Sequence, residues 1–156
     1  MIHPDIAALD FLVGRWTGQG HGAYPSIGDF EYQEEVQVIA LPKPVLAYTQ
    51  RTQRVPGGQP LHAEAGYFRL PMGIPELVIA QPTGVVEVHT GTLTGTRLVL
   101  TSQAVATTPS AAIHGIQQVQ RIVEVEDDTM RYQLSMAAVG HPLQVHLTAE
   151  LHRAEP

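Results

Sequence analysis

Hydrophobic and polar residues alternate along most of this chain, and the clearest example is the segment 142–153, which reads PLQVHLTAELHR. One face of this segment carries apolar residues and the other carries polar residues: Leu143, Val145, Leu147, Ala149 and Leu151 against Gln144, His146, Thr148, Glu150 and His152. Because side chains repeat every second residue along a strand, the pattern predicts a β-strand. It also places His146 on the polar face.

Comparable segments recur along the chain, separated by glycine and proline at short intervals. Strands are predicted near 15–22, 29–40, 44–54, 60–70, 76–81, 84–92, 96–104, 116–126, 129–138 and 142–153. Pro56-Gly57-Gly58 and Thr94-Gly95 predict hairpin connections, and Asp127-Asp128 predicts a tight turn. The segment 105–115 is the longest break between strands, and we expect a loop there.

A single helix is expected, at residues 4–13. Pro4 suits the first position of a helix, and Asp5 lies favourably at its positive end. Apolar residues supply one face, and Gly14 follows as the end of the helix.

Ten short strands with hairpin spacing predict an all-β fold. We expect one domain over residues 1–156, an antiparallel ten-stranded barrel with a short N-terminal helix, because closure removes the exposed edges of a sheet. A two-layer sandwich is the alternative. Many strand positions hold Ala, Thr, Gln or His instead of large aliphatic residues, which favours a ligand cavity over a filled core.

Composition excludes several classes of protein. The formal net charge is −6 and Lys43 is the single lysine, so the clustered positive charge of a nucleic-acid binder is missing. The absence of cysteine excludes disulfides and thiolate ligands. The first residues have no basic region typical of a signal peptide, and no apolar run approaches the roughly 20 residues that span a bilayer. The expected compartment is the cytoplasm, without membrane association.

The segment 14–20, GRWTGQG, follows the expected helix directly. A glycine-rich first strand permits a sharp bend and close approach of backbones, and Trp16 is expected to plug one end of a barrel. A phosphate-binding loop is disfavoured, since no strand precedes the glycines and no helix follows them.

Further motifs follow in a fixed order: AYPSI at 23–27, FEYQEE at 30–35, PLHAEAGYFR at 60–69, AQPTGVVEV at 80–88, Met136, and PLQVHL at 142–147. With GxWxGxG, this series resembles the nitrobindins, a family of ten-stranded β-barrels related in shape to fatty-acid-binding proteins. The resemblance spans nearly the whole chain. It implies a haem b-binding barrel that binds nitric oxide and isomerises peroxynitrite to nitrate, with one haem per chain and a homodimeric assembly.

The resemblance also assigns residues to the haem site. It implies that His146 is the axial iron ligand and that six more side chains surround the haem: Ser26, Leu61, His62, Gln81, His114 and Met136. Three of them depart from the family pattern: Ser26 replaces a threonine, Leu61 often a methionine, and His114 a lysine. His62 is a candidate hydrogen-bond donor on the distal side of the haem, where the sequence indicates no ionic group.

The alternation in 142–153 conflicts with this assignment. If Leu147, Ala149 and Leu151 face the interior, His146 faces outward. Either a β-bulge near Val145 and His146 changes the alternation, or the polar face of Gln144, His146 and Thr148 lines the interior.

Other interpretations are weaker. His152 lies six residues beyond His146, about 20 Å along a strand, so the two cannot bind one iron. Glu34 and Glu35 point to opposite sides of a strand and form no carboxylate pair, and a zinc pattern and a GxSxG elbow are both missing. Surface positions are expected for His3, His21, His89 and His141. The alternative function is a non-enzymatic barrel that carries a fatty acid or another small apolar ligand.

Overall fold

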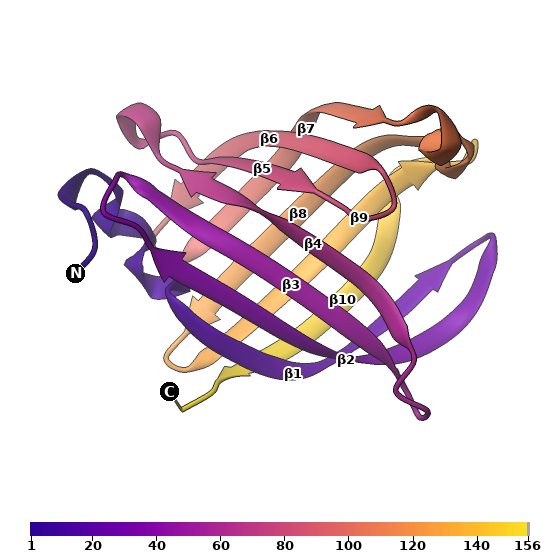
Figure 1. Cartoon of the computed structure of the whole chain (residues 1–156), viewed down its shortest axis with the longest axis horizontal. Coiled ribbons are helices and arrows are strands. Elements are labelled where there is room, and N and C mark those ends of the chain that lie inside the picture. Colours follow the sequence, from indigo (N-terminus) through magenta and orange to yellow (C-terminus); the bar gives the residue numbers. More distant parts are fainter. Residues whose placement is uncertain (156) are drawn as a thin grey trace.

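A computed structural model describes residues 1–155 and shows ten antiparallel strands closed into a barrel (Figure 1). The strands are β1 (Gly14–Tyr24), β2 (Ile27–Ala40), β3 (Val45–Val55), β4 (Pro60–Arg69), β5 (Glu76–Ala80), β6 (Val85–Thr94), β7 (Arg97–Thr107), β8 (Ile116–Glu126), β9 (Thr129–Ala138) and β10 (Gln144–Arg153). Each strand pairs with its neighbour in sequence, and β10 closes the circle on β1. The predicted barrel is therefore confirmed, and the sandwich alternative is wrong.

One end of the barrel is closed by the expected helix. This element, η1 (Pro4–Leu12), is a 3-10 helix that turns Ile6, Leu9 and Leu12 into the barrel core. Trp16 is completely buried beside it and donates its indole N–H to the carbonyl oxygen of Leu12 at 2.9 Å. Packing of these apolar side chains seals this end, so Trp16 lies where a plug was predicted.

Glycines in β1 let aromatic side chains cross its inner face. A Cβ atom on Gly20 or Gly22 would collide with the rings of Tyr32 and Phe30 on β2. The missing side chains therefore create the space that these rings occupy, which is a packing role rather than phosphate binding.

Two shorter elements differ from expectation. The segment 105–115 is not a loop throughout: β7 extends to Thr107, and Pro109–His114 form a second 3-10 helix, η3. A third one, η2 (Pro71–Gly73), connects β4 and β5. Figure 1 shows η3 and the turn between β1 and β2 at the end of the barrel opposite η1. Within residues 1–155, no helix is long and apolar enough to cross a membrane.

Candidate functional site

A cavity of about 710 Å³ occupies the interior of the barrel. Its size lies within the range of small-molecule and cofactor sites, about 300–1,000 Å³. All seven residues that the family resemblance assigns to the haem line this one cavity: Ser26, Leu61, His62, Gln81, His114, Met136 and His146. They come from the β1–β2 turn, β4, the residue after β5, η3, β9 and β10, so closure of the barrel brings distant segments together.

His146 reaches the cavity through a β-bulge. Val145 pairs with Ser135 of β9 and Leu147 pairs with the adjacent Leu134, so His146 is an extra residue between two regular pairs. Val145 is exposed, whereas His146 and Leu147 both line the cavity. Of the two arrangements considered from sequence, the structure contains the bulge.

The imidazole of His146 is oriented by its surroundings. Its Nδ1 lies 3.0 Å from the carbonyl oxygen of Ala23, which can accept a hydrogen bond only if Nδ1 carries the proton. The ring also makes edge contacts with Tyr24 and Phe30, at centroid distances of 5.2 and 6.4 Å. This tautomer leaves the lone pair on Nε2, the atom available to a metal.

Burial lowers the pKa of His146, an effect that the Ala23 carbonyl opposes and His62 reinforces. The neutral imidazole is therefore favoured near pH 7, and only the neutral form can ligate iron. Tyr24, whose ring contacts His146, is hydrogen-bonded to β9. Its hydroxyl accepts from the amide N–H of Ala138 at 2.9 Å and lies 3.1 Å from the carbonyl oxygen of Met136.

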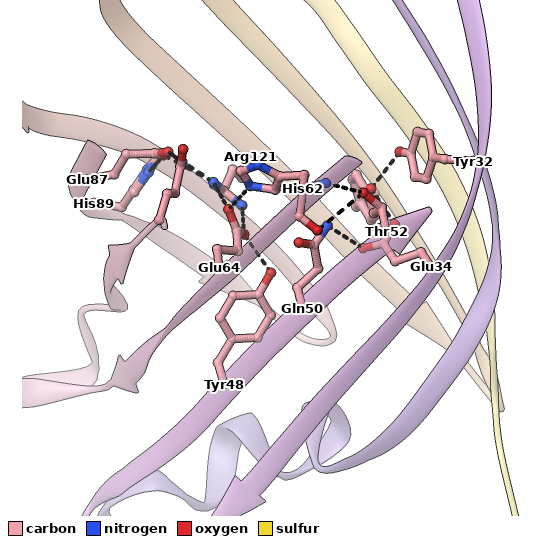
Figure 2. Close-up of polar contacts among 12 residues, drawn as sticks. Tyr32, Glu34, Tyr48, Gln50, Thr52, His62, Glu64, Glu87, His89 and Arg121 are labelled. Carbon is pink, nitrogen blue, oxygen red and sulfur yellow. Dashed lines mark hydrogen bonds and ion pairs between the residues drawn. The ribbon is translucent and has the colours of Figure 1, made fainter. Parts of the chain in front are cut away.

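Charged residues inside the barrel form a polar belt that sequence reasoning missed (Figure 2). At its centre, the Arg121 guanidinium of β8 donates to both oxygens of Glu64, at 2.7 and 3.2 Å, and to Glu87 at 3.1 Å. Glu64 also accepts from the Tyr48 hydroxyl at 2.7 Å and lies 3.0 Å from Nε2 of His62. His62 therefore contacts a buried ion pair, an ionic group that the sequence did not indicate.

Glu87 extends this end of the belt. It accepts from the Gln81 amide at 2.6 Å, and its other oxygen lies 2.7 Å from Nε2 of His89. His89 is 1% exposed, so its expected surface position is wrong. The carboxylate of Glu87 gives Nε2 of His89 the partner that water would otherwise provide, whereas Nδ1 is buried without one. His21 is exposed, as expected.

The other end of the belt is built around Glu34 of β2. The Tyr132 hydroxyl donates to Glu34 at 2.5 Å and the Gln50 amide donates at 3.2 Å, while the hydroxyls of Tyr32 and Tyr132 are 2.6 Å apart. Burial raises the pKa of Glu34 to about 7, against the opposing effect of these two donors. Glu35, the next residue, points outward to Arg15 and Arg51, which confirms that the two carboxylates form no pair.

A signal for the belt does exist in the sequence. On β2, Glu34 shares its face with Tyr32, Val36 and Val38, which are all buried. A carboxylate at an apolar position of a strand is costly to bury, so it indicates a partner from elsewhere in the fold. Glu87 carries no such signal, because it shares its face with His89 while the apolar Val86 and Val88 on the other face of β6 are exposed. Residues 1–155 contain no group of three or more His, Cys, Asp or Glu side chains arranged to hold a bare metal ion.

The closed barrel, its cavity and a neutral histidine on its wall define a small-ligand-binding β-barrel with one side chain suited to ligate iron. The family model described as "THAP4-like, heme-binding beta-barrel domain" matches residues 5–153. The chain therefore belongs to this haem-binding family, the nitrobindins, as the motif series predicted.

Individual relatives match over nearly their whole length. The chain is 43% identical to peroxynitrite isomerase 1 of Mycolicibacterium paratuberculosis, over 97% of this chain and 96% of that protein. It is 45% identical to peroxynitrite isomerase 2 of Mycobacterium marinum, with the same coverage. The crystal structure of Rv2717c from M. tuberculosis superimposes with a TM-score of 0.91 at 40% identity, covering 99% of this chain and all of that one.

Proposed function

We propose that this protein binds one haem b through Nε2 of His146 and isomerises peroxynitrite to nitrate at the ferric haem. The observation that carries the proposal is the bulge, which turns a neutral imidazole, oriented by the Ala23 carbonyl, into a cavity of about 710 Å³. Membership of a haem-binding family and relatives named peroxynitrite isomerase support it. Reversible binding of nitric oxide at the same iron belongs to the proposal.

The residues present fit a haem. An iron ligand needs its second ring nitrogen fixed, and the Ala23 carbonyl does this for His146. Leu61, Gln81 and Met136 supply cavity wall for the porphyrin, and Ser26 and His114 come from the turn and helix at the open end. When bound, ferric haem supplies a Lewis-acidic iron with one coordination position for a small ligand.

His62 is the residue best placed to act on a ligand in the cavity. Its Nε2 lies 3.0 Å from Glu64, whose position is set in turn by Arg121 and Tyr48. We therefore assign His62 an orienting role for the haem or its ligand, with Glu64 holding the ring.

Titration of the purified protein with haemin tests the ligand. The wild type is expected to give a Soret band distinct from that of free haemin, and His146→Ala is expected to lose it. His152→Ala is the matched control, because His152 lies on the same strand with its side chain 61% exposed. A free-haemin spectrum for the wild type would reject haem binding, and an unchanged spectrum for His146→Ala would reject the assigned ligand.

Rapid mixing of the ferric protein with peroxynitrite tests the reaction. We expect decay faster than in buffer, with nitrate as the product, and no acceleration by His146→Ala. Decay at the buffer rate would reject the isomerase activity while leaving haem binding intact.

A second candidate is a non-enzymatic carrier of a fatty acid or another small apolar ligand, which the apolar part of the cavity near Phe68 and Leu77 favours. Displacement of a fluorescent fatty acid, measured beside the haemin titration, separates the two. We further expect a cytoplasmic homodimer without nucleic-acid or membrane partners, and light scattering during size exclusion tests the dimer.

A further inference from the structure

The polar belt contains a guanidinium at one end and no cation at the other. Figure 2 shows Glu87, Arg121 and Glu64 together on one side and Glu34 on the other, with Gln50 between them. Both oxygens of Glu64 and one of Glu87 contact the guanidinium within 3.2 Å, whereas Glu34 receives bonds from an amide and a hydroxyl. The belt thus buries three carboxyl groups and one guanidinium. Glu34 is the carboxyl group that has no cationic partner, and this needs an explanation.

Gln50 points to the same deficiency independently. It lines the cavity and is 7% exposed, and its amide nitrogen is engaged by Glu34. Its amide oxygen is buried without a hydrogen-bond partner. A buried acceptor without a donor costs about 1–3 kcal/mol, so a donor beside Gln50 and Glu34 would relieve both groups.

Below the belt, the cavity wall becomes apolar towards η1. Leu12, Val36, Phe68, Leu77, Leu100 and Met130 line this part, and they belong to the buried core. A ligand that contacts Glu34 and Gln50 from this side must therefore have an apolar part, which packs on these six side chains (the cavity floor), and a hydrogen-bond donor, which contacts the belt.

We propose that this deep part of the cavity binds a small amphipathic cation, a primary ammonium with an aromatic or aliphatic tail. The ammonium donates to Glu34 and to the amide oxygen of Gln50, and the tail packs on the floor around Phe68 and Leu77. A charge-assisted bond to a carboxylate is about twice as strong as a neutral one, and the low dielectric of the interior increases the difference. This site is distinct from the contact between His146 and haem.

Protonation of Glu34 competes with this ligand. Burial raises the pKa of Glu34 to about 7, so near neutral pH the carboxyl group holds a proton in a fraction of molecules. An ammonium that binds the carboxylate displaces this proton. An anionic ligand would meet Glu34 and Glu64 with like charge, and a neutral alcohol could supply a donor but no charge.

Three probes with the same ring separate these cases: 2-phenylethylamine, 2-phenylethanol and phenylacetate. Calorimetric titration at pH 8, with the protein as purified and again loaded with haemin, is expected to show the amine binding about tenfold more tightly than the alcohol. Phenylacetate is expected to show no binding. Equal affinity of amine and alcohol would overturn the cation assignment, and no binding of any of the three probes would overturn the proposed site itself.

Variants locate the site. Glu34→Gln is expected to reduce amine affinity to the level of the alcohol, while Glu35→Gln, which changes the outward-facing neighbour, leaves it unchanged. Affinity of the wild type is expected to rise about tenfold per pH unit below pH 7 and to level off above it, since the alkylammonium stays charged. A pH-independent affinity, or a Glu34→Gln variant that binds the amine like the wild type, would overturn the site. Soret spectra of the same samples report on the haem proposal separately.

Discussion

The two ends of the polar belt bury the same chemical group with opposite results. Glu64 and Glu34 are 5% and 3% exposed, and both face the interior of the barrel. Burial raises the pKa of Glu64, but Arg121 and the bonds from His62 and Arg121 outweigh it and hold this pKa well below its usual range. For Glu34 burial dominates and the pKa rises to about 7.

A buried carboxylate that stays ionised needs a charged partner. Glu34 has two good hydrogen-bond donors, Tyr132 and Gln50, and neither carries a formal charge. Hydrogen bonds from neutral groups therefore do not offset the loss of water around this carboxylate, whereas one guanidinium does so for Glu64.

Removal of the guanidinium should make Glu64 behave like Glu34. Arg121→Met leaves Glu64 and Glu87 buried without their cation, so we expect a loss of about 3–5 kcal/mol in the free energy of unfolding at pH 8. Part of this loss should disappear near pH 5, where the carboxyl groups can take up protons. Urea denaturation at both pH values measures it, and an unchanged midpoint would contradict the central role of Arg121.

Replacement of Glu34 should stabilise the protein at high pH. The pKa of Glu34 rises from 4.5 to about 7 on folding, so the group is protonated in both states below pH 4.5. Between these values only the unfolded chain loses the proton, and stability falls as pH rises; above pH 7 the full cost, about 3 kcal/mol, is present. Glu34→Gln should therefore gain up to this amount at pH 8 and nothing at pH 4. Denaturation curves that stay parallel across pH would contradict the raised pKa.

Loss of a donor to Glu34 should have a smaller effect that depends on pH. Tyr132→Phe removes the 2.5 Å hydrogen bond, and we expect about 2 kcal/mol of destabilisation at pH 8. The effect should shrink below pH 6, because the protonated carboxyl group depends less on this donor. Thermal unfolding at pH 5 and pH 8 checks it, with Tyr67→Phe, an exposed tyrosine on β4, as the control.

The smallest effect is expected on the outside of the same strand. Glu35 pairs with Arg15 and Arg51, whose side chains are 50% and 75% exposed. Pairs of this kind contribute about 0.2–1 kcal/mol and are screened by salt. Glu35→Gln should lower stability by no more than this, and by less in 1 M salt. A loss comparable to that of Arg121→Met would show that burial is not what distinguishes the two faces of β2.

The fold could be predicted from sequence because its signals are local. Alternation along 142–153 concerns a single strand, and the turn residues Thr94-Gly95 concern a single hairpin. Because neighbouring strands pair with each other, little choice of topology remains. The exceptions are the two short 3-10 helices that begin at Pro71 and Pro109, which strand patterns do not reveal.

The candidate site was predictable only in part. Motifs directed attention to His146 and its six companions, but the bulge that turns His146 inward depends on its pairing with β9. The belt could not be predicted from sequence because its charged residues lie on four different strands, which meet only when the barrel closes. These residues are Glu34, Glu64, Glu87 and Arg121. His89 was missed for a different reason: on β6 the apolar Val86 and Val88 are exposed, whereas the face of Glu87 and His89 is buried, so the alternation indicates the wrong face.

The bulge in β10 has a consequence for how this protein can change over time. From Leu147 to Leu151, the inward and outward directions of the side chains follow from regular pairing with β1 and β9. His146 is the extra residue of the bulge, so its direction does not follow from this pairing. Point substitutions on either side leave the regular pairing and the bulge intact. A single-residue deletion between 141 and 145 would draw the bulged residue into regular pairing and turn the histidine out of the cavity. A shortened turn should thus remove from the cavity the imidazole that we propose as the haem ligand, even when every side chain of the site is retained.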